Sequence, residues 1–259
     1  MEPLQTRKPT GLPSWPVLLL TGREKTGKSY QAARASASEL IGRTFWIGFG
    51  EKDPDEYGAI PGARFEIVPH DGSLEDFYQK VRAAAAAPID DGRKNLLVID
   101  SGTRIWDELR DQATDSAIAR QSFDKGGNPI VGMDLWNVAT GKWAKILAAA
   151  RTHDGPVIIT ARLDTVTVMN DAGKPTKDKT DKIKGQKDLP YDVDAIVEMP
   201  ERGKATLTGA RSVIFKMPER LDIDWFEEQG VDGLWRRLGL DSSPTSQPVY
   251  AEPPNSEEV

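Results

Sequence analysis

The residues best suited to chemistry lie near the amino terminus, between a short apolar run and an alanine-rich run. Residues 22–29 read Gly-Arg-Glu-Lys-Thr-Gly-Lys-Ser, which satisfies the pattern Gly-x-x-x-x-Gly-Lys-Ser/Thr. Loop amides and the amino terminus of the following helix point at phosphate oxygens in this motif, and the helix dipole favours their negative charge. We therefore predict a nucleotide site at Gly22, Arg23, Glu24, Lys25, Thr26, Gly27, Lys28, Ser29 and the adjoining Tyr30.

Two further side chains complete the chemistry that a phosphate loop requires. Lys28 is expected to reach the β- and γ-phosphates, and Ser29 to ligate Mg²⁺. Asp100 follows the apolar run 96–99, so its carboxylate is expected at the carboxyl edge of a buried strand, beside the loop. We predict Ser29 and Asp100 as the magnesium ligands, the alternative for Asp100 being an ordinary strand-end aspartate.

Hydrolysis also needs a group that orients the attacking water. Glu51 follows the apolar run 44–49 and is the candidate, with Asp53, Asp55 and Glu56 as nearby competitors. A further buried run, 156–160, ends in Thr160-Ala161-Arg162. Thr160 and Arg162 therefore come at the end of a predicted strand, and an ordinary strand end is the plain interpretation of both.

The elements that must position these residues alternate along the chain. Short apolar runs typical of strands occur near residues 16–20, 44–49, 65–68, 96–99 and 156–160, with helical segments near 30–41, 73–87, 103–123 and 134–152 between them. This alternation predicts an α/β fold, with a mostly parallel sheet covered by helices on both faces. Runs near 163–169, 195–197, 205–208 and 212–215 predict an antiparallel extension at one edge, before a last helical region in 222–240.

Composition limits the class of protein. The 259 residues carry a net charge of −6 and no cysteine, which excludes disulfides and fits a reducing cytoplasm. No apolar run approaches the ~20 residues that span a bilayer. We expect an irregular arm over residues 1–14, one domain over 15–240, and a disordered acidic tail over 241–259, which contains neither Lys nor Arg. The two histidines, His70 and His153, are expected at surface turns.

These residues together resemble the RecA family of recombinase and helicase ATPases. The resemblance rests on Glu24 within the loop, on Glu51 followed by Asp53-Pro54, and on the segment 98–101, Val-Ile-Asp-Ser. It covers residues 15–217 and implies a RecA-like P-loop core that uses ATP and Mg²⁺, with Glu51 as the catalytic glutamate. The glutamate segment is one residue shorter than the family pattern. Thr160 stands where a γ-phosphate-sensing Gln is usual in the family, and Arg162 is the alternative for that role. The chain looks most like the short, core-only RecA-like ATPases of bacteriophages, which are associated with single-strand annealing and recombination.

The resemblance also implies partners. The family binds DNA through loops after the strand that ends at Thr160, and the matching region, 163–190, contains six lysines. Lys179, Lys182, Lys184 and Lys187 are the predicted contacts to single-stranded DNA, the alternative being a solvated hairpin tip. Family members assemble into rings or filaments with ATP between subunits, so Arg211 or Lys216, flanking the last predicted edge strand, is expected to complete the neighbouring site. An edge-strand charge that limits aggregation is the alternative for both.

The sequence thus predicts an ATP-hydrolysing protein that acts on single-stranded DNA in recombination, annealing or repair, without membrane contact, and with a single-strand-binding or recombination protein as a further partner. If it is phage-encoded, it would act in the bacterial cytoplasm. Two alternatives share the core: a replicative-helicase-like motor, and an annealing module for which ATP is a switch with negligible turnover. A small-molecule kinase is a weaker alternative, because only the lysine-rich segment resembles a substrate lid.

Overall fold

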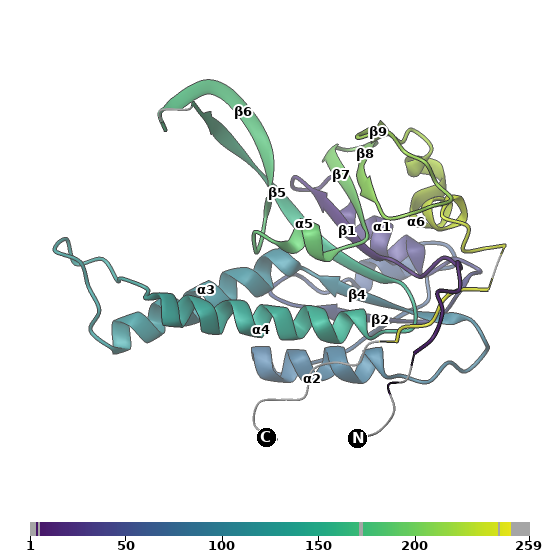
Figure 1. The fold of residues 1–259 in the computed structure, drawn as a ribbon, viewed down its shortest axis with the longest axis horizontal. Coiled ribbons are helices and arrows are strands. Elements are labelled where there is room, and N and C mark those ends of the chain that lie inside the picture. Colours follow the sequence, from purple (N-terminus) through teal and green to yellow (C-terminus); the bar gives the residue numbers. More distant parts are fainter. Residues whose placement is uncertain (1–3, 5, 171–172, 243, 250–259) are drawn as a thin grey trace.

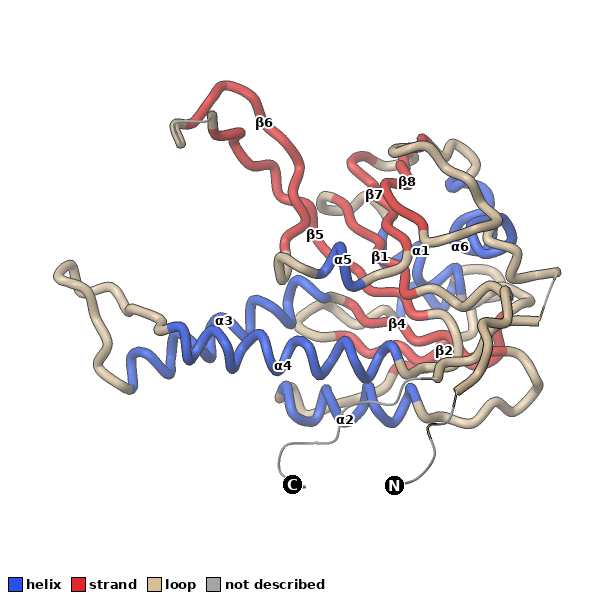
Figure 2. The backbone as a smooth tube through the Cα atoms, in the orientation of Figure 1, coloured by secondary structure: helices blue, strands red, loops and turns tan. Residues whose placement is uncertain are grey.

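A computed structural model describes residues 4, 6–170, 173–242 and 244–249. Figures 1 and 2 show a central sheet with helices against it. In chain order the elements are β1 (Val17–Gly22), α1 (Lys28–Ala35), β2 (Ile41–Gly48), η1 (Asp55–Ala59), β3 (Phe65–Ile67), α2 (Leu74–Ala85), β4 (Lys94–Asp100), α3 (Gly102–Ala119), α4 (Met133–Arg151), β5 (Val157–Met169), β6 (Pro175–Lys184), α5 (Leu189–Asp192), β7 (Ala195–Glu201), β8 (Lys204–Ala210), β9 (Leu221–Asp222) and α6 (Phe226–Arg237).

The predicted α/β fold with a mostly parallel sheet is confirmed. The strand order is β3-β2-β4-β5-β1-β7-β8-β9, with β6 paired to β5 outside this path. Every pair from β3 to β7 is parallel, while β8, β9 and β6 add antiparallel pairs. Since β5 lies between β1 and β4, the strand that ends near Thr160 separates the loop strand from the Asp100 strand. The carboxyl ends of these three strands meet at one edge.

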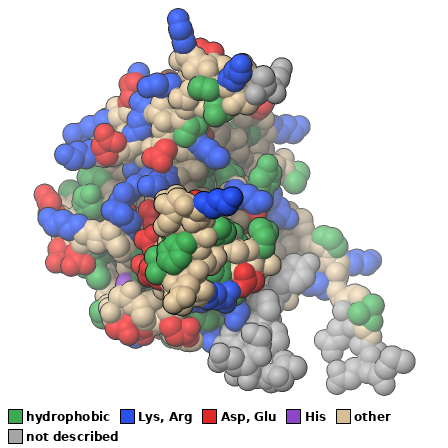
Figure 3. All heavy atoms as spheres, turned by 90° about the vertical axis from the view of Figure 1, so that its left-hand side faces the viewer, with side chains coloured by type: hydrophobic (Ala, Val, Ile, Leu, Met, Phe, Trp, Pro, Cys, Tyr) green, Lys and Arg blue, Asp and Glu red, His purple; other side chains and the backbone are tan. Residues whose placement is uncertain are grey.

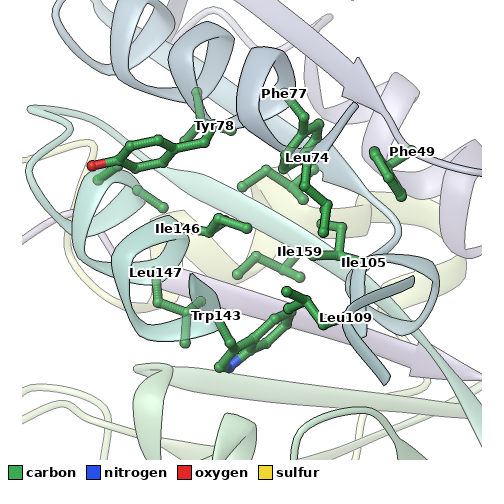
Figure 4. Packing of buried hydrophobic residues seen from close by; sticks show 14 of the residues in the cluster. Phe49, Leu74, Phe77, Tyr78, Ile105, Leu109, Trp143, Ile146, Leu147 and Ile159 are labelled. Atoms are coloured by element: carbon green, nitrogen blue, oxygen red, sulfur yellow. The ribbon is translucent and has the colours of Figure 1, made fainter. Parts of the chain in front are cut away.

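Helices cover both faces of the sheet because alternate strand residues point to opposite sides. Leu19, Ile99 and Ile159 face α2, α3 and α4, whereas Leu18, Val98 and Ile158 face α1 and α6. Figure 4 shows the first core, in which the side chains of three helices meet at Ile159. The strands are therefore apolar on both sides, which explains the continuous runs in the sequence.

The lysine-rich segment departs from the expected loop, since most of it forms strand β6. β5 continues beyond the sheet body and pairs with β6 as an antiparallel hairpin, from Arg162 opposite Lys184 out to Met169 opposite Pro175. Figure 1 shows this hairpin as an arm that projects away from the helices. Side chains alternate between the faces of a strand. Lys182 and Lys184 consequently share one face of β6, and Lys179 takes the other.

The predicted strand at 212–215 is wrong. Residues 211–220 contain neither helix nor strand, and the Ser212 hydroxyl accepts a hydrogen bond from the Phe215 N–H at 2.9 Å. Such a local bond holds the backbone in a turn and competes with pairing in a sheet. Arg211 and Lys216 therefore do not flank an edge strand; the last edge strand is β9.

The segments at the two ends of the chain lie together. Residues 6–13 form neither helix nor strand, and Ser14 makes an isolated parallel bridge with Ser246. Of the predicted acidic tail, residues 243 and 250–259 lie outside the described residues. In the described part of the chain no helix combines the length and apolarity needed to cross a membrane.

Candidate nucleotide-binding site

The loop between β1 and α1 has the geometry that close backbone approach requires. Gly27 adopts φ +102°, and a Cβ at Gly22 would lie 2.4 Å from the Met199 carbonyl oxygen of β7. Only glycine tolerates such positions without strain. Lys28 Nζ donates to the carbonyl oxygens of Gly22 at 2.9 Å and Arg23 at 2.7 Å. The ammonium group is thus held inside the loop, where burial lowers the pKa of Lys28 and the nearby Asp100 opposes that shift.

The two predicted magnesium ligands are adjacent. Ser29 Oγ donates to Asp100 Oδ2 at 3.0 Å, and the Thr160 hydroxyl donates to Asp100 Oδ1. Asp100 is 6% exposed, and burial raises the pKa of its carboxyl group, while the two hydroxyl donors lower it. A hydroxyl and a carboxylate are hard oxygen donors that suit Mg²⁺, which usually takes few protein ligands together with phosphate and water. Among the described residues, no cluster of three or more His, Cys, Asp or Glu could form an all-protein metal cage.

Glu51 follows β2, the strand beside the Asp100 strand β4, and is held by three neighbours. Its Oε1 accepts hydrogen bonds from Ser101 Oγ at 2.9 Å and Arg162 Nη2 at 2.6 Å, and Arg104 Nε lies 3.8 Å away. The Ser101 hydroxyl also caps α3 by accepting from the Arg104 N–H at 3.4 Å. The carboxylate is therefore positioned by Ser101, which follows β4, and by Arg162 of β5.

These side chains line one cavity of about 500 Å³ at the carboxyl edge of the sheet. Its walls come from the loop and α1, from the ends of β2, β4 and β5, and from the base of the β5–β6 arm, as follows: Glu24, Lys25, Lys28, Ser29, Glu51, Asp100, Ser101, Thr160, Arg162, Leu163, Asp164 and Lys184. Acidic and basic groups converge here as a magnesium–triphosphate site requires. A cavity of about 610 Å³ beside Trp15 and His153 contains no loop residue in its described lining.

Some predicted site residues lie elsewhere. The Arg23 side chain is outside the cavity lining and pairs with Asp181 of β6, where its Nη2 donates to Oδ1 at 2.9 Å and to Oδ2 at 3.0 Å. Arg211 follows β8 at the opposite edge of the sheet, where its guanidinium lies 3.6 Å from Asp194. Lys216 is exposed in the irregular segment 211–220. Lys179, Lys182 and Lys187 are exposed on or just after β6.

The sequence analysis missed two features of this region. Lys184, expected at a DNA surface, belongs to the cavity lining. The hydrogen bond from Arg162 to Glu51 joins residues 111 positions apart, and only the adjacency of Arg162 to Thr160 pointed toward it.

The fold and this site define a P-loop ATPase. Residues 16–222 match the AAA domain family, and because this is most of the 259 residues, the chain belongs to that family. No curated protein matches the sequence. One solved structure with similarity is "a prototypical ATPase from the type III secretion system of pathogenic bacteria", at 17% identity and TM-score 0.43, covering 73% of this chain and 54% of that one. This chain thus spans about half the length of that ATPase.

Proposed function

We propose that this ATPase is RecA-like, resembling the core-only phage proteins, and acts on single-stranded DNA in recombination, annealing or repair in the cytoplasm. The observation that carries the proposal is the β5–β6 arm. It bears the lysines, it continues the strand that holds Thr160, and its base lines the cavity. DNA bound to this arm would thus lie no farther from the triphosphate than the length of the hairpin.

Each of the cavity residues would have a distinct role in ATP hydrolysis. Ser29 and Asp100 would hold Mg²⁺, which when bound neutralises charge on the phosphates. Lys28 would bind the β- and γ-phosphate oxygens. Glu51 would accept a proton from the water that attacks the γ-phosphorus, while the bond to the β–γ bridging oxygen breaks and leaves ADP and inorganic phosphate. Thr160 would fix the Asp100 carboxylate through its hydroxyl group.

The arm would bind DNA mainly through charge. Figure 3 faces the side from which the arm projects, and Lys and Arg side chains are frequent in its upper part, with acidic groups among them. Exposed lysines neutralise backbone phosphates and release counterions, so binding would weaken steeply as salt rises and tolerate many sequences. Because Lys179 and Lys182 lie on opposite faces of β6, a DNA strand that contacts both would wrap around the arm rather than follow one face.

Assembly is the remaining part of the proposal. We expect a ring or filament in which a basic residue of one subunit approaches the ATP of the next, with a single-strand-binding or recombination protein as a further partner. Arg211 and Lys216 stay candidates for that residue, as exposed groups outside any edge strand.

The decisive experiment measures ATP hydrolysis with and without single-stranded DNA over a salt series. We expect stimulation at low salt that fades as salt rises, and its loss when Lys179 and Lys182 are both changed to Ala. The matched control changes Lys142 and Lys145, two exposed lysines of α4, to Ala. Equal stimulation of both double variants would contradict a DNA site on the arm. If the Glu51→Gln variant anneals DNA without hydrolysing ATP, the protein is an annealing module that ATP switches and not a motor. Strand displacement that requires hydrolysis would instead favour the helicase-like motor.

A further inference from the structure

Two cations face each other at the base of the arm. Arg162 of β5 and Lys184 of β6 are direct cross-strand partners, and both line the cavity that contains Lys28 and Asp100. Like charges directly opposite each other destabilise an antiparallel pair. Such a pair is expected in a cavity wall when an anion compensates it, and the cavity is the site of a triphosphate.

The backbone at this point is fixed to the Asp100 strand end. The buried Thr103, near the start of α3, donates through Oγ1 to the Lys184 carbonyl at 2.5 Å and accepts from the Arg162 N–H at 2.9 Å. One hydroxyl group therefore joins both strands of the arm to the helix that follows Asp100. These two hydrogen bonds hold the base of the arm, from which Arg162 and Lys184 extend, against the start of α3.

The two side chains are engaged differently. Arg162 forms the close ion pair with Glu51, whereas the Lys184 ammonium has a loose ion-pair partner among the described residues, Asp107 Oδ2 at 3.8 Å. The Lys184 side chain is 38% exposed, so its flexible stem has room to turn into the cavity. Lys182, the next residue outward on the same face of β6, is exposed and is not among the described residues that line the cavity.

We propose that Lys184, with Arg162 beside it, contacts the γ-phosphate from within the same chain and stabilises the charge that spreads over its oxygens during hydrolysis. Lys184 is thus a nucleotide-site residue and not part of the DNA surface. The inference rests on the proposed hydrolysis in this cavity. The interaction between a preorganised cation and the phosphoryl oxygens becomes stronger as negative charge develops on them. A cation supplied by the same chain therefore lessens the need for one from a neighbouring subunit.

The test compares Lys184→Ala with Lys145→Ala, which removes one charge from an exposed lysine of α4. Without DNA, we expect Lys184→Ala to lower kcat about 10²-fold or more and Lys145→Ala to leave it unchanged. Unchanged ADP affinity and melting temperature would show that the Lys184 variant is folded. Equal kcat for the two variants would overturn the inference.

A binding measurement keeps the test independent of turnover. Lys184→Ala should weaken the binding of a slowly hydrolysed analogue, ATPγS, about tenfold or more while ADP affinity stays within about twofold. A wild-type protein that fails to hydrolyse ATP would refute the proposed function, yet a selective loss of ATPγS affinity would still support the γ-phosphate contact. Equal effects on ATPγS and ADP would overturn it.

Mixing two inactive variants separates a cis cation from a trans one. In mixed assemblies of Lys184→Ala with Glu51→Gln, a site that borrows Lys184 from its neighbour would regain activity, because the Glu51→Gln chain would supply the missing lysine. A cis contact predicts no recovery above the sum of the two variants. Recovery would overturn the assignment to the same chain.

Discussion

Changing Thr160 to Val removes one hydroxyl group from a fully buried position and keeps the shape of the side chain. In the native protein this hydroxyl donates to Asp100, whose pKa is already raised by burial. A hydrogen bond to a charged group contributes about 1.5–3 kcal/mol, and its loss leaves the buried carboxylate with one fewer donor. For a chain of this size, each kcal/mol corresponds to about 2–4 °C in Tm. We therefore expect a fall of about 5 °C at neutral pH.

Thr44 of β2 provides a matched control, because it is equally buried but its hydroxyl has no hydrogen-bond partner among the described residues. Thr44→Val should leave the free energy of unfolding unchanged or raise it by up to about 1 kcal/mol, since an unsatisfied hydroxyl is removed. The assay is denaturant unfolding of both variants and of Thr160→Ser, which keeps the hydroxyl group. An equal loss of stability in the two Val variants would refute the reasoning.

The pH dependence gives a second readout of the same perturbation. Because the pKa of Asp100 is raised in the folded state, its charged form lowers the free energy of unfolding. This loss is complete at pH values above the folded-state pKa and absent at pH values below the ordinary value of 3.8. Loss of the Thr160 donor raises that pKa further. The stability difference between wild type and Thr160→Val should therefore shrink as pH falls through the folded-state pKa. A difference that is constant with pH would show that the lost energy does not come from the carboxylate.

Three further substitutions test the site and the loop. Glu51→Gln should lower kcat by about 10²–10⁴-fold, measured by phosphate release, because the amide accepts no proton; unchanged turnover would exclude Glu51 as the base. Asp100→Asn should abolish turnover yet raise the free energy of unfolding by about 1–2 kcal/mol, since a buried charge is removed; a less stable variant would contradict this. Gly22→Ala, whose Cβ would meet the Met199 carbonyl at 2.4 Å, should lower stability by about 1–3 kcal/mol in thermal melts, whereas Gly141→Ala, with open space in α4, should not.

The sequence was sufficient for the elements whose signals are local. Continuous apolar runs predicted the buried strands, because both faces of the sheet are covered. The helical segment expected near 73–87 is α2, whose start is capped by Ser73 Oγ, which accepts from the Asp76 N–H at 3.1 Å. The Asp76 carboxylate in turn accepts from the Asp71 N–H at 3.0 Å. The sequence therefore predicted that a helix begins here, but not which hydrogen bonds its first residues make.

Features decided by long-range contacts were not predictable in the same way. His153 was expected at a surface turn but is 6% exposed, and its Nε2 lies 2.7 Å from the Asn95 carbonyl oxygen. The polar, lysine-rich β6 lacks the apolar alternation of a strand; its pairing with β5 and the Arg23–Asp181 ion pair hold it in place. A single sequence does not show which partner a charged residue will meet 158 positions away.

Strand β5 is the element through which the nucleotide site and the arm are physically continuous. Thr160 contacts Asp100, Arg162 contacts Glu51, and the same strand then leaves the sheet body to pair with β6. The Arg23–Asp181 ion pair ties the phosphate loop to that hairpin a second time, from the other side. If nucleotide binding at Arg162 or the loop changes the affinity of the arm for its ligand, then by thermodynamic reciprocity a ligand on the arm changes nucleotide affinity by the same factor.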